Sequence, residues 1–137
     1  MKVERAYYEA IDGTNIKENE KIVLESKCTG YSYLFAKNVK GANIKALEEV
    51  VLESKDLEYC YLFAFYIKDA NIKAHQQVIL ESKDSKFCYN FARDVPESNK
   101  EELFKVVLEY GDKVCINLFL EKVDFNKEKF VNYLLFI

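Results

Sequence analysis

Apolar residues recur along the chain with two nested periods. Within short stretches they stand three or four residues apart, the spacing that places side chains on one face of an α-helix. The whole pattern then returns every 28 residues, and an asparagine marks the start of each copy. These asparagines are Asn15, Asn43, Asn71 and Asn99. A unit that returns at a fixed period of this length predicts a tandem array of supersecondary elements.

The first half of the repeat predicts a helix, as the second copy shows. Its apolar residues Ile44, Leu47, Val50 and Val51 fall on one helical face. Asn43 precedes them and is expected to cap the helix, because its side chain can accept a hydrogen bond from a backbone N–H of the first turn. In the first and fourth copies a glutamate follows the asparagine by three residues, which is typical of a capping box.

The second half of the repeat predicts another helix. In the second copy Tyr59, Cys60, Phe63, Ala64 and Ile67 fall on one face. The polar sequence Ser-Lys-Asp separates the two helices in the second and third copies and supplies a cap for the second helix. Each copy is therefore expected to form one pair of antiparallel helices.

The predicted fold is all-α: an α-solenoid of antiparallel helix pairs, with about ten short helices in a single domain. A single pair cannot bury its apolar face alone, so the pairs are expected to stack on one another. The expected ranges are a leading helix at 3–12, repeats at 15–42, 43–70, 71–98 and 99–125, and a trailing helix at 126–137.

The two terminal helices are expected to continue the same register. In the leading helix, Val3, Tyr7 and Ile11 are predicted to face the core. In the trailing helix, the residues predicted to face the core are Phe130, Val131, Leu134 and Leu135.

The repeat resembles known helical-repeat proteins. Its core at 53–64 reads Glu-Ser-Lys-Asp-Leu-Glu-Tyr-Cys-Tyr-Leu-Phe-Ala, which is similar to short tandem repeats of uncharacterised bacterial and phage proteins. It resembles HEAT, armadillo and tetratricopeptide arrays more distantly, because its period is shorter and their signature residues are missing. The resemblance covers nearly the whole chain. It implies an α-solenoid fold, and for function it implies only binding.

The composition is typical of a folded intracellular protein. Half of the 137 residues are hydrophobic, which is enough to form a core. No stretch approaches the roughly 18 consecutive apolar residues of a membrane helix, and the N-terminus lacks the apolar stretch of a secretion signal. We therefore expect a cytoplasmic protein without a membrane partner. The net charge of −3, from 20 basic and 23 acidic residues with interspersed signs, disfavours general binding to nucleic acid.

Residues that carry catalysis or bind metals form no recognisable motif. The cysteines, Cys28, Cys60, Cys88 and Cys115, lack Cys-x-x-Cys spacing, and two of them hold the same position in successive repeats. They are expected to pack as small hydrophobic residues. The sequence has no glycine-rich phosphate loop and no Ser-His-Asp arrangement. We expect no enzyme activity, no catalytic residue, no cofactor and no metal.

The copies differ most at two adjacent positions near the end of the second helix. Lys37 and Asn38 of the first copy are replaced by Phe65 and Tyr66 in the second, whereas the third and fourth copies are charged there. Exposed aromatic residues are typical of protein-binding hot spots. We therefore interpret these two residues as candidates for partner binding. The alternative is that Tyr66 adds to the core, since it shares a helical face with Phe63.

Two rows of residues also repeat along the array. Tyr33, Tyr61 and Tyr89 are expected to form a ridge that either contacts a partner or hydrogen-bonds the next repeat. The second row consists of lysines beside glutamates, and we interpret it as a solvated face rather than a phosphate site. Its members are Lys27, Lys55 and Lys83.

His75 is the only histidine, at a position that holds asparagine or leucine in the other copies. We expect it to fill a core position, because a lone histidine without a matched partner is weak support for catalysis. Gln76 beside it replaces a glutamate of the second copy, so this helix is locally less acidic. Both residues are secondary candidates for a contact surface.

These features favour a non-enzymatic protein-protein interaction module that binds a protein partner through one face of the array. The candidate partner-binding residues are Phe65, Tyr66, Tyr61, Tyr33, Tyr89, His75 and Gln76. One alternative is single-stranded nucleic-acid binding, with bases stacked on the tyrosines and phosphates bound by the lysines, although nucleic acid is the less favoured partner. Another is a small phage-encoded inhibitor of a host defence system. A monomer is expected, with a homodimer through the apolar C-terminus at 133–137 as the alternative.

Overall fold

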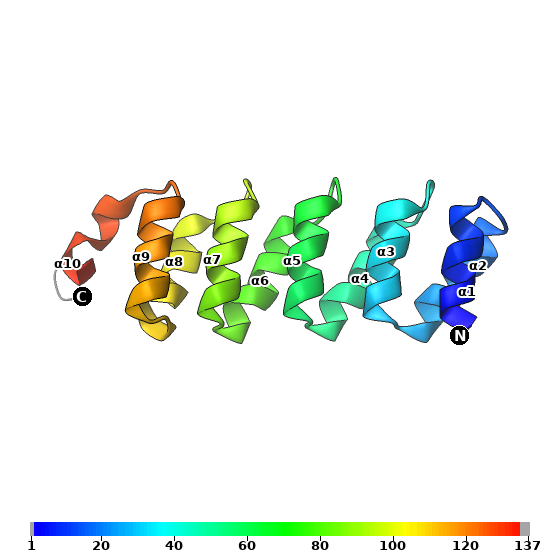
Figure 1. The fold of residues 1–137 in the computed structure, drawn as a ribbon, viewed down its shortest axis with the longest axis horizontal. Helices are drawn as coiled ribbons and strands as arrows, with labels where there is room; N and C mark the ends of the chain where they lie inside the picture. Colours follow the sequence, from blue (N-terminus) through cyan, green and yellow to red (C-terminus); the bar gives the residue numbers. More distant parts are fainter. Residues whose placement is uncertain (1, 135–137) are drawn as a thin grey trace. The chain divides into compact units, whose positions relative to one another are not determined.

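The computed structural model describes residues 2–134. Over this range the chain forms α-helices and one 3-10 helix, with no strand. The helices are α1 (Lys2–Ile11), α2 (Ile16–Ser26), α3 (Thr29–Asn38), α4 (Ile44–Ser54), α5 (Leu57–Tyr66), α6 (Ile72–Ser82), α7 (Ser85–Asp94), α8 (Lys100–Tyr110), α9 (Lys113–Lys122), the 3-10 helix η1 (Lys127–Phe130) and α10 (Val131–Leu134). The all-α prediction is confirmed, and each half of a repeat forms one helix (Figure 1).

The chain divides into two compact units, Met1–His75 and Gln76–Ile137, and α6 crosses the boundary between them. In the first unit α1, α3 and α5 lie side by side in one layer, and α2 and α4 form a second layer against them (Figure 1). In the second unit α7 packs against both α8 and α9. This is solenoid packing of neighbouring helix pairs within each unit. The expectation of a single domain stays a prediction.

The Ser-Lys-Asp turn between the two helices of a repeat has a fixed structure. The Ser54 hydroxyl donates to the carbonyl of Val51 (2.6 Å) and accepts from the N–H of Asp56 (3.2 Å). The Asp56 carboxylate then caps α5 by accepting from the N–H of Tyr59 (3.0 Å). Lys55 between them has a left-handed backbone with φ 58°. The third copy repeats these contacts. The lysines of the row therefore lie directly after the first helices of their repeats.

Three asparagines cap the first helices of their repeats, as predicted. The side-chain oxygens of Asn43, Asn71 and Asn99 accept from the backbone N–H three residues later, at 3.1–3.2 Å. In a capping box, a glutamate of the same helix would accept from the N–H of the cap residue itself. Here that N–H donates to a buried side chain of the preceding repeat.

We call these bonds the inter-repeat clasp. The pairs are Asn43 N–H with Glu20 (2.7 Å), Asn71 N–H with Glu48 (2.7 Å) and Asn99 N–H with Gln76 (2.8 Å). All three acceptor residues are buried. A buried polar group without a partner is costly, so each clasp fixes the start of one helix against the preceding repeat.

The first copy departs from this pattern at its start. Asn15 has a left-handed backbone (φ 45°) and its side chain makes no capping hydrogen bond, so the prediction that it caps α2 is wrong. The chain enters α2 from a Schellman turn, in which the N–H of Thr14 donates to Glu9 and that of Gly13 to Ala10. Gly13 takes the left-handed conformation that this turn requires, with φ 85°. The turn leaves Asn15 outside the geometry of an N-cap.

The leading helix is also out of register with the repeats. Its buried residues are Val3, Ala6, Tyr7 and Ala10. Ile11 is 43% exposed, so the prediction that it faces the core is wrong. The buried residues of α1 stand 29 positions before the buried residues Ser32, Phe35, Ala36 and Val39, one more than the repeat period. One residue corresponds to a rotation of about 100° in a helix, which turns Ile11 outward.

The trailing segment begins as a 3-10 helix rather than an α-helix. Phe130 is buried, as predicted, but Val131 is 48% exposed, contrary to the prediction. The tighter winding of a 3-10 helix changes the direction of the residues that follow it. Leu134 is half-buried. Leu135 and the rest of the predicted trailing helix lie outside the described residues.

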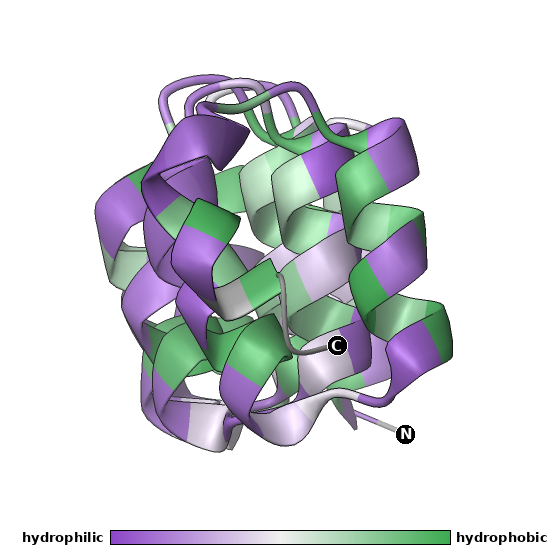
Figure 2. Ribbon diagram, turned by 90° about the vertical axis from the view of Figure 1, so that its left-hand side faces the viewer, coloured by the Kyte–Doolittle hydropathy of each residue, from purple (hydrophilic) through white to green (hydrophobic). Residues whose placement is uncertain are grey.

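The core is built from one phenylalanine of each second helix. Phe35, Phe63, Phe91 and Phe119 are fully buried, and the helices carry hydrophobic bands next to hydrophilic ones (Figure 2). In the fourth copy Phe104 stands at the repeat position of the clasp acceptors. Its ring lies 4.8–4.9 Å from the rings of Phe119, Phe125 and Phe130. An aromatic cluster therefore takes the place of the clasp in this copy.

Candidate partner-binding surface

An exposed aromatic pair lies at the end of α5. Phe65 is 46% exposed and Tyr66 is 53% exposed. Their rings are stacked, with centroids 4.7 Å apart and planes inclined by 24°. The ring of Tyr61, one turn earlier, lies 5.9 Å from that of Phe65. The alternative that Tyr66 belongs to the core does not hold.

The end of α5 is fixed from its opposite side. Phe63 and Ile67 are buried, and the N–H of Ile67 donates to the carbonyl of Phe63 (3.0 Å). Neighbouring residues on a helix point about 100° apart. Between these two anchors Ala64 is also buried, whereas Phe65 and Tyr66 face solvent. Phe65 and Tyr66 are therefore displayed by a rigid element rather than by a loop.

A lysine from the neighbouring helix lies over Tyr66 of the aromatic pair. The Nζ atom of Lys37 on α3 lies 4.4 Å from the centre of the Tyr66 ring and 5.9 Å from that of Tyr33. Both are cation–π distances. We define the aromatic patch as Tyr61, Phe65, Tyr66 and Lys37. Both helices that contribute to it belong to the first unit.

The row of tyrosines does not form an exposed ridge. Tyr33 and Tyr89 are 4% and 8% exposed, and Tyr61 is half-buried. Burial raises the pKa of Tyr33, with smaller contributions from Tyr66 and Tyr59. Tyr33 and Tyr89 thus pack within their units, and of the row only Tyr61 belongs to the patch.

His75 lies in the core, in a polar contact that the sequence did not reveal. It is fully buried and stacks on Phe63, with centroids 5.2 Å apart. Its Nε2 atom lies 2.9 Å from a carboxylate oxygen of Glu48, the same residue that accepts from Asn71. The Nδ1 atom is buried without a hydrogen-bond partner. Desolvation lowers the pKa of His75, and its hydrogen bond to Glu48 opposes that shift.

Gln76 is also buried, so it does not contribute to an outer surface. Its side-chain oxygen takes part in the inter-repeat clasp with Asn99. Its amide nitrogen lies 3.5 Å from the carbonyl of Asn99 and 3.5 Å from the carboxylate of Glu102. A glutamine provides both an acceptor and a donor here, which a glutamate could not.

The buried cysteines are chemically unreactive. Burial raises the pKa of Cys60 and of Cys88 to about 12. Their Sγ atoms face the carbonyls of Val51 and Ile79 at 3.8 and 3.9 Å. Because the thiolate is the reactive form, these side chains act as packing residues. Across residues 2–134, no three side chains of His, Cys, Asp or Glu gather closely enough to hold a metal ion.

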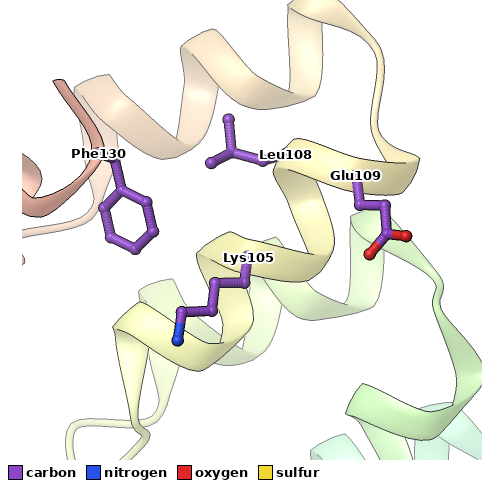
Figure 3. Close-up of a pocket in the computed structure, with 4 residues that line it drawn as sticks. All are labelled: Lys105, Leu108, Glu109 and Phe130. Atoms are coloured by element: carbon purple, nitrogen blue, oxygen red, sulfur yellow. The ribbon is translucent and has the colours of Figure 1, made fainter. Parts of the chain in front are cut away.

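A groove of about 380 Å³ lies beside α8 in the second unit. Its described lining comprises Lys105, Leu108, Glu109 and Phe130 (Figure 3). The lysine and the glutamate flank an apolar floor, and no nucleophile is paired with a base among these residues.

No family model matches the chain, and neither the curated proteins nor the solved structures include a match to it. Within the described range no helix is long and apolar enough to cross a bilayer. The fold and the surface define a helical-repeat protein with an exposed aromatic patch. Its function has to be inferred from that surface.

Sequence reasoning missed the inter-repeat clasp and the buried pair of His75 and Glu48. One signal was available: Glu20, Glu48 and Gln76 hold the same repeat position, and all three can accept a hydrogen bond. Glutamate on a helix is usually exposed. Nothing local distinguishes a buried carboxylate whose partner lies in the next repeat.

Proposed function

We propose that this chain is a non-enzymatic interaction module that binds a protein partner through the aromatic patch of its second repeat. The observation that carries the proposal is the stacked, exposed pair of Phe65 and Tyr66 at the end of α5. In the other copies the equivalent positions hold charged or amide side chains. The pair is therefore a local departure from a regular array rather than a requirement of the fold.

Energetic arguments support this use of the patch. Large aromatic side chains dominate the binding energy of protein interfaces, and a few such residues often contribute most of it. A rigid helix end limits the entropy lost on binding, because the side chains are already held in place by their neighbours. The exposed parts of the two rings are apolar surface in contact with water, and a partner would remove them from water.

The structure does not favour the nucleic-acid alternative. Base stacking needs exposed ring faces, but Tyr33 and Tyr89 are buried. Lys55 and Lys83 of the lysine row follow the last residues of α4 and α6, where the backbone is left-handed. We therefore propose a protein partner.

The proposal is tested by selecting peptides from a random display library against the intact chain. The selected peptides are then measured against the double variant Phe65→Lys/Tyr66→Asn, which keeps a helix end of the kind found in the first copy. We expect each selected peptide to bind the original chain at least about 30-fold more tightly than it binds the double variant. A decrease of this size corresponds to the loss of one hot-spot residue.

The matched control is Tyr110→Asn in the second unit. Tyr110 is an exposed tyrosine with a lysine, Lys83, 5.3 Å from its ring centre, so it reproduces the lysine-tyrosine contact without a second stacked ring. Peptides that bind the chain should bind this variant equally well. If every selected peptide binds the double variant as tightly as the original chain, the patch is not the binding surface.

A further inference from the structure

We propose that the partner of the aromatic patch is an acidic protein segment with one aromatic anchor, an inference that rests on the proposed function and deepens it. The argument starts from a position that differs between copies. In the second helix of the first three repeats, the residue four positions after the row tyrosine lies against that tyrosine.

In the first and third copies this residue is a cation. Lys37 lies 5.9 Å from the ring centre of Tyr33, and the guanidinium carbon of Arg93 lies 5.1 Å from that of Tyr89. Each tyrosine face is thereby covered by a positive charge from its own helix. A cation over an aromatic face is a favourable arrangement.

In the second copy a phenyl ring takes the place of the cation. Phe65 lies 5.9 Å from Tyr61, and its other neighbour is the stacked ring of Tyr66. The substitution converts a charged position into apolar surface. An aromatic anchor from a partner can extend this stack, because offset and tilted ring pairs are favourable beyond the area that they bury.

The charged residues around the patch determine which residues should flank the aromatic anchor in the partner. Lys37 lies over Tyr66. Lys40 and Lys68 are exposed in the segments that follow α3 and α5. None of the three lysines forms a salt bridge within the described residues. The one carboxylate in these two segments is Asp69, which is exposed.

Three lysines against one aspartate give the patch a positive rim. Complementary charge at the rim of an interface speeds association and selects partners, although it adds less affinity than the buried anchor. Glu58 lies on the same helix, but it precedes Phe65 by seven residues, which is about 10 Å along the axis. The expected partner therefore places carboxylates beside the anchor, and a basic segment would be repelled.

Four synthetic peptides of equal length test the inference. The first carries one tryptophan flanked by glutamates, the second has lysines in place of the glutamates, the third has neutral glutamines, and the fourth has alanine in place of tryptophan. The chain contains no tryptophan, so the fluorescence of the first three peptides reports binding directly. The fourth is measured by competition against the first.

We expect the acidic tryptophan peptide to bind at least about tenfold more tightly than the glutamine peptide at low salt, and the difference to shrink at about 0.3 M salt because exposed charges are then screened. The lysine peptide should bind more weakly than the glutamine peptide, and the alanine peptide should compete at least about 30-fold less well.

Two variants locate this binding. Phe65→Lys/Tyr66→Asn should lower affinity for the acidic peptide at least about 30-fold. Lys37→Glu keeps both rings but leaves two lysines against two carboxylates, so it should abolish the preference for the acidic peptide over the lysine peptide. Lys83→Glu is the matched control and should change neither affinity, since Lys83 covers the exposed Tyr110 instead. Circular dichroism confirms that each variant is folded.

Equal affinity for the acidic and glutamine peptides would overturn the inference, and so would failure of the acidic peptide to bind. Either result leaves the proposed function standing if library peptides still depend on Phe65 and Tyr66. Binding of the acidic peptide that the double variant does not weaken would overturn both proposals.

Discussion

The buried pair of His75 and Glu48 predicts that the chain loses stability in mild acid. Desolvation lowers the pKa of His75 in the folded protein, whereas in the unfolded chain it titrates near 6.5. Above that pH the histidine is neutral in both states and contributes no pH dependence. As the pH falls below it, the unfolded state binds a proton that the folded state does not. The free energy of unfolding therefore decreases.

The size of the effect follows from this linkage. If His75 stays neutral in the folded protein, the unfolded state gains at most about 1.2 kcal/mol between pH 7 and pH 5.5. Protonating the folded histidine would leave its Nδ1–H buried without an acceptor, because no partner faces that atom. The groups that face the ring from neighbouring helices are Glu48 of α4 and Phe63 of α5.

The assay is urea denaturation at pH 7, 6 and 5.5, followed by far-ultraviolet circular dichroism. The control is His75→Leu, because leucine fills the equivalent and fully buried positions Leu47 and Leu103. The original chain should lose about 1 kcal/mol more than this variant over the range. The double variant His75→Leu/Glu48→Gln removes both members of the buried pair. Identical pH dependence in the chain and both variants would refute the reasoning.

Three further predictions follow from the packing. Glu48→Ala should lower the free energy of unfolding by about 2–4 kcal/mol, because the N–H of Asn71 and the buried imidazole of His75 lose their acceptor, whereas Glu48→Gln should cost less than about 1 kcal/mol; equal losses in urea denaturation would contradict this. Lys55→Gly should raise stability by about 0.5–1 kcal/mol, because glycine suits a left-handed backbone, and an unchanged or lower melting temperature would argue against strain there. Cys60, with its pKa raised to about 12, should resist a thiol reagent at pH 8 while the half-exposed Cys28 reacts; equal rates without denaturant would show that the core opens.

The aromatic patch could be predicted only in part from the sequence. The replacement of Lys37 and Asn38 by Phe65 and Tyr66 was visible as a break in the repeat, but periodicity allowed either a surface or a core position for Tyr66. The structure decides this because Phe63 and Ile67 anchor the opposite side of the helix end. Lys37 and Tyr66 lie on equivalent helices of successive repeats, 28 residues apart in the sequence. A pattern of neighbouring residues cannot predict a contact between them.

The sequence by itself determined the helices, their order and most of their caps. Helix formation depends on residues three and four positions apart, and the caps at Asn43 and Asp56 depend on the same short range, so a periodic sequence contains this information. The exceptions lie at the ends of the array. At Ile11 the helix register is shifted by one residue, and at Asn15 the chain leaves a Schellman turn with a left-handed backbone. Only the folded chain shows both departures.

The tertiary structure alone decided which polar side chains are buried. Glutamate is a residue type that is usually found at the surface. Glu48 is nevertheless buried, and it accepts hydrogen bonds from Asn71 and His75 of the following repeat. A carboxylate is stable in the interior only when such donors satisfy it. Those donors come from another part of the chain, so the repeat pattern could mark the position but could not show that it is buried.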